Sequence, residues 1–540
     1  MNISFKYKRM AIQDKKLLYF AIVAILTLSM GSVAFAQFDD VPYNIAPIEA
    51  PFDMPQLKRP VFPEATFDIR DYGALETGES ENFSNTDAIH KAIEAAHEAG
   101  GGKVIIPAGD WYTGPIHLKS YINLHISEGA TLFFSDVRDD YLPVVLQRHN
   151  GVECYNYSPP IYAYKVKNVA ITGTGTLDAQ GEKLWWDWSL EQREILGTPR
   201  ERRAAASPLP LSRRSKFCRG SEPGEGAERP SFAVFWESED ILIEGVTFIN
   251  GPMWNIQPIY SQRIIIRGVT INSLDAHNGD GIVLDSSKDV LIEYTRLMTG
   301  DDAIVLKSGL NEDGLKIGIP TESVVIRNFE AIDVRTGSGG IVFGSETSGG
   351  IRNVYVHDAY FNGSDRGIRF KSRRGRGNVV ENIFINNIRL ENISQQAIHL
   401  DKYYGGPGET GPAPLFKDVF ISNIQVDGAE MGIEIVGIPE KWFENITFEN
   451  ILINNVEEGV RFSRVNNIRL KNVEVNSDSR AMIAYDAYEM HLDNVILNDN
   501  TGYPPLLIEG EYTGAIFKNE YTLENMEIGD GLTDRIILDR

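Results

Sequence analysis

Short apolar stretches recur along most of the chain in one pattern. A polar residue is followed by alternating apolar positions, then by Asn or Gly, and then by another apolar residue. The clearest copy runs from Asp240 to Val246, and successive copies start 22 to 36 residues apart. Later copies start near Arg263, Asp289, Ser323, Asn353, Asn382, Asp418, Asn445 and Asn467, and weaker early copies lie at Tyr121 and Asn168. Alternation predicts strands, and repetition at this length is typical of a β-solenoid.

The repeat predicts the fold class. One coil cannot bury its apolar face alone, whereas coils stacked at ~4.8 Å bury a continuous core and pair their backbone groups. We therefore expect an all-β chain folded as a right-handed parallel β-helix. A β-propeller is the competing fold, but its blades need a regular spacing of about 40–50 residues, which these gaps do not show.

The region before the repeats predicts one helix. The Ala and Ile spacing from Ala88 to Ala99 follows a helical period, with Asn85 as the expected N-terminal cap and Gly100 as the stop. This helix is expected to cap the open end of the solenoid. Short strands are expected at Phe67–Ile69 and Val104–Ile106.

The first 36 residues have the pattern of a signal peptide. A lysine- and arginine-rich start precedes an apolar run from Leu17 to Met30, and Ala34-Phe35-Ala36 follows as a cleavage pattern. The alternative is a membrane anchor, but the run is short for a span. We therefore expect export to the periplasm or the exterior, with no membrane span in the mature protein.

The rest of the chain divides into an arm and one domain. Residues 37–65 are rich in proline and lack periodicity, so we expect an N-terminal arm before a single β-helix domain at residues 66–540. Residues 189–230 interrupt the repeats with clustered Arg, Pro and Gly, and predict a long insertion. A solvated loop is the favoured interpretation, and a substrate lid is the alternative.

Charge and cysteine content limit the classes of function that the chain can have. The net charge of −23 argues against nucleic-acid binding, which needs a basic surface. An anionic substrate would need a local basic strip. The only two cysteines, Cys154 and Cys218, could form a disulfide, and no Cys and His set has zinc-ligand spacing.

Acidic residues recur on what should be neighbouring coils. Asp280 lies in Asn278-Gly279-Asp280-Gly281, and Asp301 and Asp302 follow Gly300 about one coil later. The three carboxylates should therefore stack on one face, where mutual repulsion raises at least one pKa. A protonated acid beside ionised bases is the arrangement that glycosidases use.

Arg369 and Lys371 form a candidate anion site. They are two residues apart, so that both side chains should leave a strand on the same side. Two aligned cations can bind a sugar carboxylate. The basic strip continues in Arg366, Arg373, Arg374 and Arg376. Each motif alone is also common in turns or solvated faces, and it is their order on stacked coils that favours a site.

These motifs resemble glycoside hydrolase family 28, the polygalacturonases, which have the pectin-lyase-like β-helix. The resemblance covers nearly all of the chain after residue 36, and the bacterial exo-polygalacturonase branch is most similar. It is carried, in order, by "DYGA", "NTDAIHKAIEAAHEAGGGKVIIPAG", "GPIHLKS", "GVECYNYSPPIYAY", "ITGTGTLDAQG", "GPMWNIQP", "NGDGI", "GDDAIVLKSG", "GSGGIVFGSETSGGIRNV" and "RGIRFKSRRGRG".

The resemblance implies inverting hydrolysis of α-1,4-linked galacturonan without a metal or other cofactor. By motif position, Asp301 would be the general acid, and Asp280 and Asp302 would activate the attacking water. Asn278 would orient the cluster. The implied partner is an acidic polysaccharide or oligosaccharide, and we expect an exo-acting monomer.

The chain departs from the family pattern at two places. Asn278-Gly279-Asp280 replaces Asn-Thr-Asp, and Gly337-Ser338-Gly339 replaces Gly-His-Gly. Ser338 therefore stands where the family has a histidine in the site, as a candidate substrate-binding residue. His277 and His399 are candidate replacements, although either could be an ordinary structural histidine.

Three other functions stay open. A hydrolase of the same fold could act on rhamnogalacturonan or another uronic-acid polymer. A pectate lyase would use calcium and an arginine base, and the Gly300-Asp301-Asp302 motif argues against it. A non-catalytic polysaccharide-binding β-helix would not need its three aspartates.

Overall fold

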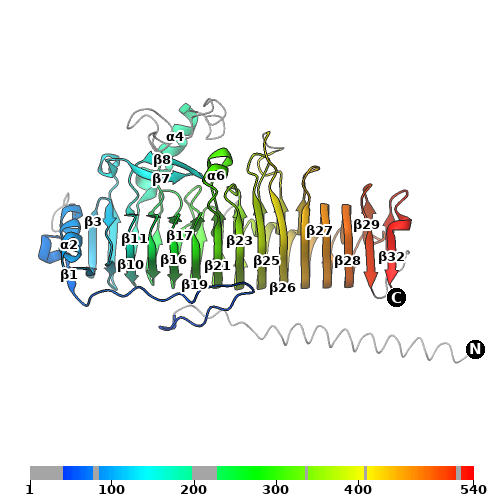
Figure 1. Ribbon diagram of the computed structural model, residues 1–540, viewed down its shortest axis with the longest axis horizontal. Helices are drawn as coiled ribbons and strands as arrows, with labels where there is room; N and C mark the ends of the chain where they lie inside the picture. The colour runs from blue at the N-terminus through cyan, green and yellow to red at the C-terminus, as the bar shows by residue number, and fades with distance from the viewer. Residues whose placement is uncertain are drawn as a thin grey trace, which may run out of the picture. The chain divides into compact units, whose positions relative to one another are not determined.

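The computed structural model describes residues 41–76, 84–196, 228–334, 338–406, 410–518 and 525–539. These residues lie in the compact unit Val41–Arg540. The unit is mostly β, and thirty of its strands join in one hydrogen-bonded network (Figure 1). Every pair in that network is parallel, as in β10–β13, β13–β16 and β16–β19. The predicted all-β class with a long parallel sheet is therefore confirmed.

The first half of the network contains strands of three to twelve residues. They are β1 (Thr66–Asp68), β2 (Gly102–Ile106), β3 (Gly109–Thr113), β4 (Ile116–Leu118), β5 (Ile122–Ile126), β6 (Ala130–Phe134), β9 (Ile161–Tyr164), β10 (Lys167–Gly173), β11 (Thr176–Asp178), β12 (Ala233–Trp236), β13 (Glu239–Glu244), β14 (Thr247–Ile249), β15 (Ile256–Ile259), β16 (Gln262–Arg267), β17 (Thr270–Ser273), β18 (Ile282–Asp285), β19 (Lys288–Thr299) and β20 (Ile304–Lys307).

Many of the later strands run continuously through their corners and are longer. They are β21 (Thr321–Ile332), β22 (Gly339–Gly344), β23 (Ile351–Asn362), β24 (Arg366–Lys371), β25 (Val379–Asp401), β26 (Leu415–Val436), β27 (Phe443–Ser477), β28 (Met482–Asp499), β29 (Leu506–Glu509), β30 (Ala515–Lys518), β31 (Met526–Ile528) and β32 (Ile536–Asp539).

The corners of the coils explain the repeat seen in the sequence. The polar residue that starts every copy, from Tyr121 to Asn467, has a φ between 49° and 67°. This left-handed region costs most residues about 1–2 kcal/mol, but Asn and Asp adopt it readily. The corner side chains also bond from coil to coil, because Asn467 Nδ2 donates to Asn445 Oδ1 at 2.8 Å, and Asn445 Nδ2 donates to Asp418 Oδ1 at 2.7 Å.

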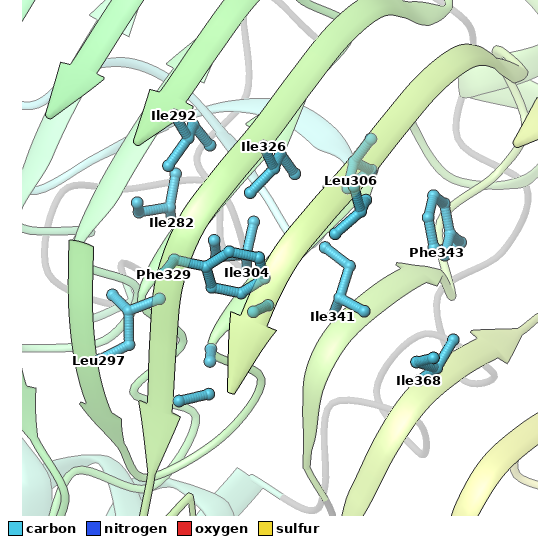
Figure 2. Close-up of a cluster of buried hydrophobic side chains, with 14 of the residues drawn as sticks. Ile282, Ile292, Leu297, Ile304, Leu306, Ile326, Phe329, Ile341, Phe343 and Ile368 are labelled. Carbon is cyan, nitrogen blue, oxygen red and sulfur yellow. The ribbon is translucent and has the colours of Figure 1, made fainter. Parts of the chain in front are cut away.

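Stacked apolar side chains fill the interior. Ile282 pairs in register with Ile304, Ile304 with Ile341, and Ile341 with Ile368. All four are fully buried, and Figure 2 shows them beside further interior aliphatic and aromatic side chains. This column fixes the register of β18, β20, β22 and β24. Of these strands, β18 and β20 directly follow the candidate acidic residues.

The predicted N-terminal helix is α2 (Thr86–Glu98), which packs against β1, β2 and β4. The expected cap is wrong in detail, because the Asn85 side chain makes no capping bond to the helix. Asn85 is fully buried, and it bonds to the backbone of Leu75 and Tyr112 instead. The two expected strands are β1 and β2.

The predicted N-terminal helix is joined by helices that the strand repeat did not predict. The structure has α3 (Gly181–Leu184), α4 (Trp186–Leu196) and α6 (Asn311–Ile317), together with the antiparallel hairpin of β7 (Val145–His149) and β8 (Val152–Asn156). Short 3₁₀ turns are η1 (Ile69–Tyr72), η2 (Arg138–Tyr141) and η5 (Thr533–Arg535). The β7–β8 hairpin, α4 and α6 lie on the same side of the stacked strands (Figure 1). The α6 helix has acidic residues in its first turn and ends at Gly318 in the left-handed region, signals that the strand repeat concealed.

The described part of the arm packs along one sheet face. Ile48, Met54 and Leu57 join a buried cluster with side chains of β10, β13, β16, β19 and β21. Buried Arg267 donates to Pro42 O at 2.6 Å, and Arg327 donates to Ala46 O at 3.0 Å. The arm therefore completes the packing of that face, which its lack of periodicity did not predict.

Some sequence predictions fall outside the described residues. These are the signal peptide at residues 1–36, the arginine-rich part of the insertion at 197–227, and Cys218. The insertion's first residues belong to α4, and Cys154 is disulfide-bonded. No helix within the described ranges is long and apolar enough to span a bilayer.

Replacing the corner residue Asn450 should separate the two contributions of the corners. Asn450 has a φ of 56°, donates to Asn423 Oδ1 at 3.0 Å and accepts from Asn472 Nδ2 at 2.9 Å. Asn450→Gly loses only the side-chain hydrogen bonds between neighbouring corners, whereas Asn450→Ala also strains the backbone. The free energy of unfolding should therefore be about 1 kcal/mol lower for the Ala variant than for the Gly variant. Guanidinium unfolding midpoints measure the difference, and equal midpoints for the two variants would contradict this account of the corners.

Candidate functional site

Strand register brings two of the predicted aspartates together. Because Ile282 pairs with Ile304, Asp280 and Asp302, each two residues earlier, occupy equivalent positions on neighbouring coils. Gly281 N donates to Asp302 O at 2.9 Å and fixes this alignment. Both residues are at most 2% exposed, whereas Asp301 is partly exposed. The structure thus places the three carboxylates on adjoining coils, as the 21-residue separation of Asp280 and Asp301 predicts.

Asn278 also reaches the cluster. Its φ of 53° lies in the left-handed region that asparagine tolerates. Its Nδ2 donates to Asp301 Oδ2 at 3.0 Å, and its Oδ1 accepts from Arg229 Nη2 at 2.9 Å. Arg229 was missed from the sequence, because it lies at the end of an insertion with no strand pattern.

Two buried lysines pair with the two buried aspartates. Lys371 Nζ donates to Asp302 Oδ2 at 2.6 Å. Lys307 Nζ lies 3.9 Å from Asp280 Oδ2 and donates to Glu346 Oε2 at 2.9 Å. Neither Lys307 nor Glu346 was among the predicted site residues, although the position of Lys307 at the end of the apolar run of β20 is a signal in the sequence.

Burial and mutual repulsion shift the pKa values of the cluster. Burial raises the pKa of Asp280 well above its ordinary value, and the charge of Asp301 adds to the effect, while Lys307 opposes it. Burial and Asp302 raise the pKa of Asp301, against the lowering effects of Lys371 and the Asn278 hydrogen bond. The cluster therefore retains a proton at a pH at which an isolated aspartate is ionised.

Lys307, which lies beside Asp280, stays charged. Burial alone would lower the pKa of Lys307, but Glu346 and Asp280 raise it above its ordinary value. Burial likewise opposes ionisation of Glu346, but Lys307 and Arg376 hold the pKa of this carboxyl well below its usual range. A buried ammonium thus faces the aspartates at neutral pH.

The cluster has unused acceptors. Within the described ranges, Asp280 Oδ1 and Asp302 Oδ1 are buried and have no hydrogen-bond partner. Leaving such an atom unpaired costs about 1–3 kcal/mol, so both are suited to accept from a bound water or a hydroxyl group. The group can therefore combine a proton donor with acceptors for a nucleophilic water.

Arg369 and Lys371 share one side of β24, as predicted. Their cationic groups lie 5.6 Å and 5.2 Å from the centroid of the Tyr404 ring. Both are buried, and the ion pair of Lys371 with Asp302 links the basic pair directly to the acidic cluster. Tyr404 was not predicted, because it lies in a turn outside the repeat pattern.

The remaining basic strip is largely neutralised. Arg366 pairs with Asp365 at 2.6 Å, and Arg374 donates to Glu440 Oε2 at 2.9 Å. Arg376 donates to Ser345 O at 3.0 Å and lies 4.0 Å from Glu346. These three arginines brace neighbouring loops and carboxylates.

Ser338 lies on the coil next to Asp302. The adjacent Gly339 accepts from Ala303 N at 2.9 Å, and Ser338 O accepts from Arg366 N at 3.1 Å. Ser338 is fully buried. Gly337 lies outside the described residues.

The two candidate replacement histidines have different surroundings. His277 Nε2 lies 2.6 Å from Ser189 Oγ on α4. His399 accepts from Arg366 at 3.2 Å and lies 3.3 Å from Glu434. Burial and the charges of Arg366 and Arg369 lower the pKa of His399 to about 3, so this ring is neutral and does not supply the charge of a protonated histidine.

The β7–β8 hairpin is bonded to residues at the ends of two strands of the site coils. Arg148, fully buried on β7, donates to Asp285 Oδ1 at 2.8 Å and to Ser286 Oγ at 2.7 Å. At the hairpin turn, Gly151 O accepts from Leu310 N at 3.1 Å. The hairpin is therefore fixed to the ends of β18 and β20.

The described residues contain no group of three or more His, Cys, Asp or Glu side chains placed to hold a metal ion. Asp280 and Asp302 lie beside lysine ammonium groups instead.

Comparisons with known proteins agree with this geometry. A family model described as "Glycosyl hydrolases family 28" matches residues 216–455. A probable polygalacturonase of Vitis vinifera is 29% identical over 71% of this chain and 73% of its own length. The exo-poly-alpha-D-galacturonosidase of Dickeya chrysanthemi is 25% identical over 76% of this chain and 71% of its own length.

A solved structure extends the match to the fold. The hyperthermoactive exopolygalacturonase of Thermotoga maritima is 34% identical, with a TM-score of 0.68, over 77% of this chain and 93% of that protein. The alignment covers nearly all of that relative at an identity that shared ancestry explains. The chain therefore belongs to glycosyl hydrolases family 28 and is a glycoside hydrolase.

Proposed function

We propose that this hydrolase cleaves α-1,4-galacturonosyl linkages of pectin-type polysaccharide with inversion of configuration. The observation that carries the proposal is the cluster of Asp280, Asp301 and Asp302, joined to a cationic pair by the ion pair between Asp302 and Lys371. The names of the Dickeya and Thermotoga relatives, which describe galacturonan-cleaving enzymes, support this substrate.

Asp301 acts as the general acid. It is the most exposed of the three and can reach a glycosidic oxygen, and its raised pKa keeps a proton available. Asp280 and Asp302 activate the water with their unused acceptors. Because the charge of Asp301 raises the pKa of Asp280, activity requires that the proton retained by the cluster lies on Asp301. Activity falls as pH drops through the pKa of the bases, and as pH rises through the pKa of the acid.

Arg369 and Lys371 bind the substrate carboxylate, with Tyr404 alongside to contact the sugar ring. Asn278 orients Asp301 through its hydrogen bond, and Ser338 lines the site beside Asp302. In the free protein, Lys371 neutralises Asp302. When a galacturonate binds, the Lys371 ammonium interacts with both the substrate carboxylate and the Asp302 carboxylate.

The enzyme acts from a chain end. The β7–β8 hairpin, which is fixed by Arg148 to Asp285 and by Gly151 to Leu310, is the candidate element for closing one end of the substrate site. Both the Dickeya and the Thermotoga relatives are named as exo enzymes.

The remaining expectations complete the proposal. The coils close into a right-handed solenoid of residues 66–540, with α2 as its N-terminal cap and residues 37–65 as an arm on one face. Residues 1–36 direct export to the periplasm or beyond, where pectin fragments are met, and the mature enzyme acts as a monomer.

A second substrate is favoured by one observation. Ser338 fills, without a positive charge, a position where the family has histidine, and neutral His399 does not restore the charge. Rhamnogalacturonan, whose backbone alternates charged and neutral sugars, would require less positive charge at that subsite.

Asp301→Asn should abolish hydrolysis while leaving substrate binding intact. General acid catalysis contributes about 10²–10⁴-fold, and an amide cannot supply the proton. We expect saturated mono- or oligogalacturonides from polygalacturonate with the native protein, and a kcat at least about 100-fold lower with the variant. Asp289→Asn, at a corner that accepts asparagine, is the matched control and should keep full activity.

Near-normal turnover by Asp301→Asn would remove this residue from the mechanism. Cleavage of rhamnogalacturonan but not of polygalacturonate by the native protein would select the second substrate. Unsaturated products absorbing ultraviolet light would show a lyase.

Arg369→Gln should weaken recognition of charged substrates most. Loss of a charge-assisted hydrogen bond lowers kcat/KM on polygalacturonate by roughly 10–100-fold. Methyl-esterified oligomers carry no carboxylate charge, so their binding, measured by competition, should change far less. Arg374→Gln removes an arginine of the same strip that already pairs with Glu440, and serves as the control. Equal losses on both ligands would assign Arg369 a structural role.

A further inference from the structure

Arg229 is buried at the end of the insertion, where it contacts the acid side of the cluster. It is 2% exposed. Its Nη1 donates to Pro252 O at 3.0 Å, and its Nη2 donates to Asn278 Oδ1 at 2.9 Å. At the other end of the insertion, Ser189 holds His277, the neighbour of Asn278, at 2.6 Å. Both ends of the insertion therefore form hydrogen bonds to the turn that carries Asn278.

The hydrogen bond from Arg229 determines which way the Asn278 amide points. A guanidinium has only donors, so that it must face the amide oxygen. The amide nitrogen is then directed at Asp301 Oδ2, 3.0 Å away. Without the guanidinium, the amide could turn and present its oxygen to Asp301, which would then need the proton to make a hydrogen bond.

Asp301 is held at both oxygens. Its Oδ1 accepts from Asp302 N at 3.0 Å, and its Oδ2 accepts from Asn278. These bonds fix the plane of the carboxyl group, and a general acid must be held in the right geometry to protonate a leaving oxygen. The amide donor also favours the ionised carboxylate, against burial and the repulsion from Asp302.

We propose that Arg229 is a positioning residue that orients Asn278 and, through it, the carboxyl group of Asp301. The proposal rests on the proposed role of Asp301 as general acid. The insertion then contributes to catalysis, because Arg229 lies at its end and is linked to Asp301 through the side chain of Asn278.

Removing Arg229 should move the alkaline limb of the pH profile upward. Loss of an amide donor raises the pKa of Asp301, and because the general acid must be protonated, activity persists to higher pH. The other charged groups around Asp301, namely Asp280, Asp302, Lys307 and Lys371, are unchanged by the substitution. For Arg229→Met we expect a shift of about 0.5–1 pH unit, with kcat about 10–100-fold lower and KM nearly unchanged.

The test is a double-mutant cycle on polygalacturonate with full pH–kcat profiles for Arg229→Met, Asn278→Ala and the pair. If Arg229 acts through Asn278, the double variant shifts no further than Asn278→Ala alone. Arg229→Lys keeps the charge but lacks the planar fork of the guanidinium, so it should shift the limb in the same direction by less. It carries the test if the Met variant does not fold. Arg267→Met, another buried arginine that bonds to the arm, should lower stability with an unshifted profile.

Additive shifts in the double variant, or a native alkaline limb in the folded Arg229 variants, would overturn the proposal. Asp301→Asn measured in parallel keeps the two ideas separate. If it is active, the proposed acid is wrong; if it is inactive while the Arg229 profiles are unshifted, only the positioning role fails.

Discussion

The left-handed corner that starts each coil is the constraint on which the rest of the structure depends. Asn and Asp accept this conformation and bond to the corner of the next coil, as Asn467 does to Asn445, so that each coil stays in register with the last. Register then aligns Ile282 with Ile304, and the same alignment places Asp280 beside Asp302. The acidic cluster is thus a consequence of the way the coils stack.

Stacking also explains how charges that repel one another can share a site. The cost of burying Asp280 and Asp302 is offset by Lys307 and Lys371, which the same columns bring within reach from β20 and β24. Asp301 has no lysine in direct contact among the described residues and is held by the Asn278 amide instead. This difference in partners is what divides the proposed roles of acid and base among three identical side chains.

Much of this arrangement could be predicted from the sequence, because the corners leave a readable pattern. The repeat starting at Asp240 predicted the strands, and its spacing predicted that Asp280 and Asp301 lie on adjoining coils. Contacts from outside the repeat could not be predicted. Arg229, Arg148 and the arm residue Ile48 reach the sheets from segments without periodicity, and only the folded chain shows where they bind.

The central claim is that the three aspartates act as an inverting acid and base on an α-linked substrate. Proton NMR during the first turnovers on polygalacturonate tests it most directly, because it records the anomeric form of the new reducing end before mutarotation. Inversion predicts that the β-anomer forms first and the α-anomer grows later. Initial formation of the α-anomer would mean a retaining reaction with a covalent intermediate, and would contradict the account.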